Sequence, residues 1–393
     1  MKEIRIVLIF LLVILLSNCV NNKNMLNDKD SLVIELNFNN SVDIHDTGLI
    51  DSIDILRLSN DAILGQVDKI VKHNNYVFLL DAFITKSVFV YDLSGNFIKQ
   101  LVTIGKGPKE CLQPMDIFID KKENILAVVS RTDKKLLKYN LDNLNLMSVE
   151  KLPKPFFFLS NIENGYIGCM NNLIDDNKPF NLWTMSNSLE LKNSFFEIPS
   201  SWNSIASGNI QPFSRYNDEV YYIQPYDFNI YCVDEKENKV SYKYDLGSNT
   251  WPSDIKEYED IKRINENSPN RYIGGFYTFQ ETQNYLITRT VFKNEELLGV
   301  YNKKNRETYV AKPSSYSDKY LISFGKIIGM DENAIYSLVA AESVNKIIVG
   351  KDKYNDFESM YPVQVKNLRE KFKGVSISEE DNPFLLIHYF SVE

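Results

Sequence analysis

The amino-acid sequence predicts an all-β fold, a six-bladed β-propeller in which the N- and C-terminal strands close one blade. Two observations support this prediction. A pair of short β-rich runs, at residues 77–81 and 88–92, returns 48 positions later at residues 125–129 and 136–140, and a repeat of this length is typical of a four-stranded propeller blade. In addition, strong strand-like runs lie near both ends of the chain, where a ring of sheets has to be closed.

The first residues form a pattern typical of a secretory signal peptide. A charged start at residues 1–5 precedes an unbroken apolar run at residues 6–16. This run is shorter than the roughly 20 residues that a helix needs to span a bilayer, and small polar residues follow it, as in a cleaved signal. We therefore expect residues 1–18 to direct export.

Leu16-Ser17-Asn18-Cys19 resembles a bacterial lipobox, the motif in which the cysteine is lipidated and becomes the mature N-terminus. Asn18 departs from this resemblance, because Gly, Ala or Ser is usual before the cysteine, and an ordinary cleaved signal with an incidental cysteine is the alternative. Acyl chains on Cys19 would hold a soluble domain at a membrane surface. The polar stretch that follows predicts a flexible tether, so residues 19–48 are expected to link the anchor to the folded domain.

The composition is that of a globular protein, with 44% hydrophobic and 12% aromatic residues. We expect one domain, at residues 49–393, because repeat folds of this length commonly form a single domain. The formal net charge is −8, and Lys and Arg are scattered along the chain. Nucleic-acid binding is therefore not expected, since it relies on a basic surface.

Three cysteines remain besides Cys19, at Cys111, Cys169 and Cys232. Their odd number and the absence of CxxC spacing predict neither a disulfide framework nor a zinc site. Cys169 and Cys232 lie in β-rich runs, so we expect them to be small core residues.

The strands can be assigned in order along the chain. Residues 52–58 alternate apolar and polar side chains, as expected for a half-buried strand that opens the domain. Ser94-Gly95-Asn96 lies between two β-rich runs and supplies the positive φ of a tight hairpin. The runs of the six predicted blades are, in order, residues 66–71, 77–81, 88–92 and 97–101; 114–120, 125–129 and 136–140; 165–169 and 182–185; 220–223 and 230–234; 276–279, 285–288 and 297–301; 327–330, 334–339 and 346–349.

Two segments interrupt this pattern and two others are predicted to close the ring. Residues 252–267 and 361–373 place apolar side chains three or four positions apart, which predicts short amphipathic helices on loops. Residues 382–390 form a strong final strand. We expect this strand to share a sheet with residues 52–58, because an unclosed ring would leave unpaired strand edges.

The sequence at residues 88–92, 104–110 and 114–117 resembles an NHL-type propeller repeat. More closely, the whole mature chain resembles the six-bladed β-propeller lipoproteins of Bacteroidetes, which share an opening like residues 53–58, a Gly-x-Gly-Pro-x-Glu loop and an ending like residues 382–385. The resemblance implies a location in the cell envelope and no established reaction.

The loop formed by Gly105, Gly107, Pro108 and Glu110 allows two interpretations. It lacks the Gly-Lys-Ser/Thr sequence and the following helix of a P-loop. We interpret it as a structural connection between blades, in which the glycines adopt unusual φ values and Glu110 accepts hydrogen bonds from backbone amides. A ligand-binding loop is the alternative.

The sequence offers few residues for a metal centre or for covalent catalysis. Its three histidines are His45, His73 and His388, too few for the histidine-rich centre found in some propeller enzymes. We predict no metal site and no cofactor, and a calcium site made of carboxylates is the alternative. No Gly-x-Ser-x-Gly motif or Cys/His pair suggests a nucleophile.

Five aromatic residues are candidates for ligand binding because they fall in or beside predicted loops. Flat rings with polar edges can stack on sugars or contact a peptide, although propellers also use aromatic side chains to pack neighbouring blades. The candidates are Trp202, Phe213, Tyr216, Tyr226 and Trp251.

Together these patterns favour a lipid-anchored, monomeric propeller that binds a protein or glycan ligand in the cell envelope without catalysis. The alternative is a propeller hydrolase or lyase with a calcium-supported central channel, and a structural scaffold is a third possibility. We expect an outer-membrane lipoprotein that faces the periplasm, because residues 20–23 contain no acidic residue of the kind that often follows the cysteine in surface lipoproteins. Exposure on the cell surface is the other option.

Overall fold

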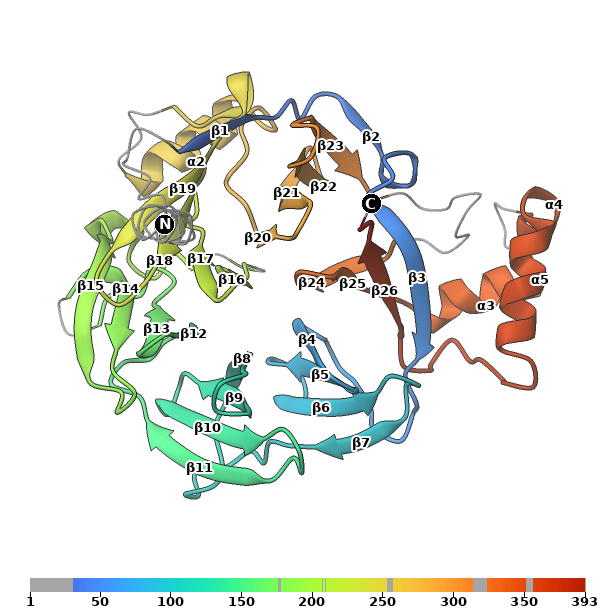
Figure 1. Cartoon of the computed structure of the whole chain (residues 1–393), viewed down its shortest axis with the longest axis horizontal. Coiled ribbons are helices and arrows are strands. Elements are labelled where there is room, and N and C mark those ends of the chain that lie inside the picture. The colour runs from blue at the N-terminus through green and yellow to red at the C-terminus, as the bar shows by residue number, and fades with distance from the viewer. Residues whose placement is uncertain are drawn as a thin grey trace, which may run out of the picture.

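A computed structural model of the chain shows six small sheets arranged in a ring (Figure 1). The structure describes residues 31–175, 178–206, 208, 210–252, 257–313, 324–350 and 356–392. The predicted signal peptide, Cys19 and residues 20–30 of the predicted tether lie outside these ranges. No helix among the described residues has the length and apolar character needed to cross a membrane.

Each blade contains four antiparallel strands, and its innermost strand faces the centre of the ring (Figure 1). The predicted six-bladed propeller is therefore confirmed. From the inside outwards, blades one to five contain β4 Lys69–His73, β5 Tyr76–Asp81, β6 Ser87–Asp92 and β7 Phe97–Gln100; β8 Pro114–Asp120, β9 Ile125–Ser130, β10 Lys135–Asn140 and β11 Leu146–Lys151; β12 Phe158–Ile162, β13 Gly165–Cys169, β14 Phe180–Met185 and β15 Leu191–Glu197; β16 Phe213–Tyr216, β17 Glu219–Tyr222, β18 Asn229–Val233 and β19 Asn238–Asp245; β20 Thr278–Glu281, β21 Tyr285–Phe292, β22 Glu295–Asn302 and β23 Thr308–Lys312.

Blade six joins the two ends of the folded region, as predicted. Its strand order is β24 (Lys326–Met330), β25 (Ala334–Val339), β26 (Phe384–Phe390) and β3 (Ile50–Arg57). The last strand, β26, lies between β25 and β3, and Leu386 of β26 pairs with Ile55 of β3. Closure therefore depends on backbone pairing between segments more than 300 residues apart.

The N-terminal segment that precedes β3 is not a simple tether, and the predicted boundary at residue 48 is wrong. The strand β1 (Leu32–Glu35) pairs in parallel with β19 of blade four, and β2 (Ser41–Asp43) pairs in parallel with β23 of blade five. Figure 1 shows this segment along the outer edge of the ring. These strands are short and lie among polar residues, so the sequence pattern does not indicate them. Each one pairs with backbone N–H and C=O groups at the outer edge of a blade.

The apolar core lies between neighbouring blades. The strand β5 shows why: Val77 and Leu79 belong to the cluster between blades six and one, whereas Phe78 and Leu80 belong to the cluster between blades one and two. Successive side chains of a strand point to opposite faces of its sheet. Inner strands are buried on both faces for this reason, and they appear in the sequence as continuous apolar runs.

Four α-helices occur within the described ranges: α2 (Tyr258–Asn267), α3 (Ala341–Val349), α4 (Phe357–Met360) and α5 (Pro362–Lys371). The helices predicted within 252–267 and 361–373 are confirmed over the ranges of α2 and α5, and residues 253–256 of the first prediction lie outside the described residues. The strand predicted at 346–349 is wrong, because these residues belong to α3. Ala341, Val344 and Ile347 lie on the buried face of α3, three positions apart, and this helical spacing outweighs the β-branched sequence.

Two predicted turns can be compared with the structure. Gly95 has a φ of +84° in the hairpin between β6 and β7, as expected. Neither Gly105 nor Gly107 has a positive φ, so the predicted reason for these two glycines is wrong. They allow close approach instead: a Cβ on Gly105 would lie 1.8 Å from Glu110 Oε2, and the Gly107 amide donates to that oxygen at 2.8 Å.

Candidate functional site

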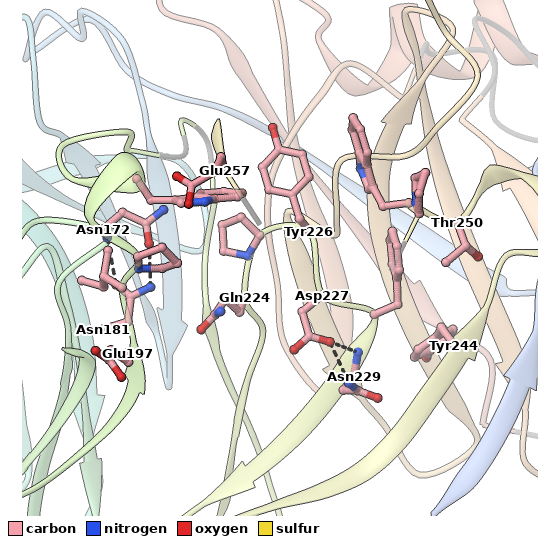
Figure 2. A pocket seen from close by; sticks show the side chains of 17 residues that line it. Asn172, Asn181, Glu197, Gln224, Tyr226, Asp227, Asn229, Tyr244, Thr250 and Glu257 are labelled. Carbon is pink, nitrogen blue, oxygen red and sulfur yellow. Dashed lines mark hydrogen bonds between the residues drawn. The ribbon is translucent and has the colours of Figure 1, made fainter. Parts of the chain in front are cut away.

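A cavity of about 800 Å³ lies between blades three and four, at the end of the sheets where β13 ends and β14 begins. Its walls come from the loop after β13, the end of β15, the loop between β17 and β18, and the segment after β19 (Figure 2). Cavities of this size commonly bind small ligands. The lining residues are Asn172, Asn181, Glu197, Ile198, Pro199, Trp202, Gln224, Pro225, Tyr226, Asp227, Phe228, Asn229, Tyr244, Thr250, Trp251, Pro252 and Glu257.

Three of the five predicted aromatic residues meet in the wall of this cavity. The ring of Tyr226 lies between those of Trp202 and Trp251, with centroid separations of 5.2 Å on both sides and interplanar angles of 71° and 73°. Such edge-to-face contacts are favourable for aromatic pairs. Residues from three separate loops are thus combined into one aromatic surface.

Trp202 is placed by a short turn that follows blade three. The 3₁₀ helix η2 (Ser200–Trp202) begins after Pro199, and the Trp202 amide donates to the Pro199 carbonyl at 2.9 Å. The backbone amide of Tyr258, the first residue of α2, donates to Ser201 Oγ at 3.4 Å. The Tyr258 ring also packs edge-on against Trp202 at 6.2 Å. The predicted amphipathic helix therefore supports the aromatic wall.

Tyr226 has an unusual backbone conformation, with a φ of +60°. A bulky residue rarely adopts a positive φ, and such strain tends to persist at functional sites where surrounding contacts hold it. The Tyr226 amide donates to the Gly274 carbonyl at 2.9 Å. Burial raises the pKa of the Tyr226 hydroxyl, with a further contribution from Tyr258 and Tyr277, so the hydroxyl keeps its proton at neutral pH.

Two polar pairs border the cavity on opposite sides in Figure 2. Asn172 and Asn181 form a reciprocal pair, in which the Asn181 side chain donates to Asn172 Oδ1 and the Asn172 amide donates to Asn181 Oδ1, both at 2.8 Å. Asp227 accepts hydrogen bonds from the backbone and side chain of Asn229 at 2.9 and 2.7 Å and from the Tyr231 hydroxyl. These side chains are fixed before any ligand arrives.

The cavity wall also contains polar groups with no protein partner. The indole Nε1 of Trp251 and the hydroxyl of Tyr244 are buried, and neither has a hydrogen-bond partner among the described residues. Buried polar atoms are nearly always paired in folded proteins. Glu197 and Glu257 also line the cavity, and both are exposed.

The other two predicted aromatic residues are not part of this cavity. Phe213 and Tyr216 lie at the two ends of β16, the innermost strand of blade four, rather than in a loop. The ring of Phe213 packs 5.7 Å from that of Tyr222, and Lys303 Nζ lies 4.8 Å from the centroid of Tyr216. Their contacts are those of a packed inner strand.

The polar residues of the cavity were not predicted from the sequence. Gln224-Pro225-Tyr226-Asp227 has the Pro and Asp typical of a turn. This pattern indicates the turn that forms one wall of the cavity. The convergence of that turn with Asn172, Asn181 and Glu197 of the neighbouring blade depends on how the blades pack, and no local pattern encodes it.

The cavity offers stacking surfaces, amide and hydroxyl groups and carboxylates, which suit a polar organic ligand. Across the described residues, no group of three or more His, Cys, Asp or Glu side chains is arranged to hold a metal ion. Cys111 and Cys169 are buried and Cys232 is half-buried, all as free thiols. Burial raises the pKa of Cys169 to about 12, which keeps this thiol protonated and unreactive.

Comparison with family models decides the family. The model described as "Domain of unknown function (DUF4934)" matches residues 30–389 of the chain. The chain belongs to the DUF4934 family. The matched range begins just before β1 and ends in β26, so all six blades of this DUF4934 protein fall within it.

The solved structures that are similar to the DUF4934 chain include two from Bacteroides species. A protein named "Putative exported protein" from Bacteroides fragilis NCTC 9343 has a TM-score of 0.68 and 18% identity, and the match covers 93% of this chain and 100% of that one. This similarity supports the fold. A DUF4221 family member from Bacteroides vulgatus ATCC 8482 has a TM-score of 0.45 and 10% identity, with 87% and 97% of the two chains covered. Comparison with curated protein sequences finds no match.

Proposed function

We propose that this protein is an exported, lipid-anchored propeller that binds a glycan in the cavity between blades three and four, without catalysis. One observation carries the proposal: Trp202, Tyr226 and Trp251, from three different loops, form a single aromatic surface beside polar side chains. Sugars present flat C–H faces edged by hydroxyl groups. An aromatic wall with neighbouring amides and carboxylates complements both features.

The polar part of the cavity supports a sugar ligand for a second reason. Asn172, Asn181, Asp227 and Asn229 are held by hydrogen bonds to each other and to the backbone. A preformed set of donors and acceptors binds without the entropy cost of ordering side chains. Tyr226 contributes a protonated hydroxyl that can donate to a sugar oxygen.

The carboxylates favour binding rather than glycoside hydrolysis. Glycosidases use a carboxylic acid whose pKa is raised by burial, together with a second carboxylate across the scissile bond. Glu197 and Glu257 are exposed, and Asp227 has both oxygens occupied by hydrogen bonds from Asn229 and Tyr231. The described lining contains no His, Cys, Ser or Lys.

The envelope location rests on the N-terminal sequence. Residues 1–18 have the pattern of a signal peptide, and Cys19 stands at the end of a lipobox-like motif. An acyl anchor at Cys19 would hold the ring at the outer membrane through a linker of about a dozen residues, up to roughly 40 Å when extended. The related structure named as an exported protein agrees with this location.

A glycan array tests the function directly. We expect the mature protein to bind a defined set of glycans and Trp202→Ala to lose that binding. Phe83→Ala is the matched control, because Phe83 is 52% exposed and does not line the cavity. Thermal melting of each variant separates lost binding from lost folding. Unchanged array binding by a folded Trp202→Ala variant would refute the proposal.

A further inference from the structure

We infer that the ligand of this cavity carries a protonated amine and that the cavity disfavours anionic glycans. The inference rests on the proposed glycan-binding function and adds the charge of the ligand to it. It follows from the charges that line the cavity, from their lack of ion-pair partners and from the unpaired polar atoms of the wall.

All charged groups among the described lining residues are acidic. They are Glu197, Asp227 and Glu257, and the described lining contains no Lys or Arg. Asp227 is engaged by its neighbours, as described above, but its charge still contributes to the local potential. Several carboxylates around one concave surface concentrate a negative field there.

Glu197 and Glu257 approach the cavity from different elements. Glu197 ends β15 of blade three, whereas Glu257 directly precedes α2, in the insertion that follows blade four. In the described part of the chain, neither carboxylate takes part in any ion pair. Glu257 takes part in the capping box at the start of α2, which leaves its negative charge in place. Neither carboxylate is therefore neutralised by a basic side chain of the described residues, and both can attract a cationic ligand.

The aromatic wall reinforces the same preference. The faces of Trp and Tyr rings attract cations through their quadrupole, and Trp202 and Tyr226 are only half-buried. Trp251 Nε1 and the Tyr244 hydroxyl, buried in residues that are 8% and 6% exposed, lack hydrogen-bond partners among the described residues. Unpaired atoms of this kind in a cavity wall point to a bound molecule that supplies the missing partner. The indole N–H can only donate, so it suits a sugar oxygen, whereas the Tyr244 hydroxyl can accept a hydrogen bond from the amine.

The physical consequence is a charge preference that depends on salt. An amine placed between exposed carboxylates gains a modest amount of binding free energy from each of them. A uronic acid or sulfated sugar would be repelled. Because such charges are screened within about 8 Å at physiological ionic strength, the preference should weaken as salt is added. Aromatic stacking should be nearly insensitive to salt.

The experiment compares three tetrasaccharide probes by calorimetry with the mature protein at low and high salt. The N-acetylglucosamine tetramer is neutral, its fully deacetylated glucosamine counterpart is cationic, and the galacturonic acid tetramer is anionic. We expect the cationic probe to bind at least about threefold more tightly than the neutral one at low salt, as two exposed charge pairs allow. The anionic probe should bind most weakly.

Charge variants identify the source of the preference. The double variant Glu197→Gln and Glu257→Gln should lose most of the preference for the cationic tetramer over the neutral one, and the part that remains comes from Asp227 and the aromatic faces. Glu163→Gln is the matched control, since Glu163 is exposed and lies at the opposite end of β12 and β13, and it should keep the preference. Equal or tighter binding of the neutral tetramer by the native protein would overturn the inference, while glycan binding on the array would still stand. Failure of all three tetramers to bind would also overturn the inference, whatever the array shows.

Discussion

The guanidinium of Arg57 lies 2.9 Å from the carboxylate of Asp381, although the two residues stand near opposite ends of the folded chain. Arg57 ends β3 and Asp381 precedes β26, so this ion pair joins the two strands that close blade six. Asn382 strengthens the junction by donating to the carbonyls of Ser59 and Ala62 at 2.8 and 2.7 Å. The ring is therefore closed by a sheet and by a polar contact beside it.

Removal of residues 382–393 should unfold the whole domain. The deletion removes β26, which separates β25 from β3 in blade six, and it leaves the apolar faces of blades one and five without a neighbour. We expect loss of the cooperative thermal transition in circular dichroism. A truncated protein that melts at the temperature of the full-length chain would contradict closure by β26.

His388 should make stability fall as the medium becomes acidic. Burial lowers the pKa of His388 to about 3, with a smaller contribution from His45, whereas the unfolded chain titrates near its ordinary value of about 6.5. The unfolded state therefore binds a proton first as pH falls below about 6.5. We expect this group to reduce the free energy of unfolding by about 2 kcal/mol near pH 5 relative to neutral pH.

Urea unfolding of the native protein and of His388→Asn at both pH values measures this contribution. Asn retains a polar group for Ser337, whose hydroxyl lies 2.8 Å from His388 Nε2. The drop in stability between neutral and acidic pH should be smaller in the variant. An identical drop in both proteins would assign the acid sensitivity to other groups.

Gly95→Ala should destabilise the first blade. Gly95 has a φ of +84°, and a Cβ there would lie 2.0 Å from the Arg57 carbonyl oxygen. We expect a cost of about 1–3 kcal/mol from backbone strain and displacement. Gly208→Ala is the control, because apart from its chain neighbours no atom of the described residues lies within 4 Å of its Cβ position. Equal denaturation midpoints for the two variants would show that the hairpin tolerates a side chain.

Glu110→Ala should affect stability and not glycan binding. The Glu110 carboxylate accepts a hydrogen bond from the Gly107 amide, and Lys135 of β10 donates to the Glu110 carbonyl at 2.6 Å. Loss of the first bond is expected to cost about 1 kcal/mol. Reduced array binding with unchanged stability would favour the alternative that this loop binds a ligand.

Much of the fold could be predicted because each blade is encoded locally. Val77 and Ile125 occupy equivalent strands of blades one and two, and their runs are apolar because both faces of an inner strand are buried. The predictions fail where tertiary contacts determine the secondary structure of a segment. Residues 346–349 have a β-rich sequence but complete the buried face of α3, and β1 gains its structure from pairing with β19.

The site could be predicted only in part, for a related reason. The sequence identifies Trp202, Tyr226 and Trp251 because they fall in or beside predicted loops, where flat rings can contact a ligand. Phe213 and Tyr216 meet the same criterion, yet they belong to an inner strand. Glu197 and Asn181 had no distinguishing sequence feature. Their role depends on the packing of blade three against blade four, which brings together loops distant in the sequence.

Intrinsic fluorescence tests the central claim most directly, because the chain has three tryptophans. Trp202 and Trp251 line the cavity, whereas Trp183 packs in the core between blades two and three. The measurement is a titration of Trp183→Phe with the tightest glycan from the array. Emission should change and saturate along the same curve as calorimetric binding, and adding Trp202→Phe should reduce the change. Glycan binding with no change in Trp202 and Trp251 emission would place the ligand elsewhere and contradict the account.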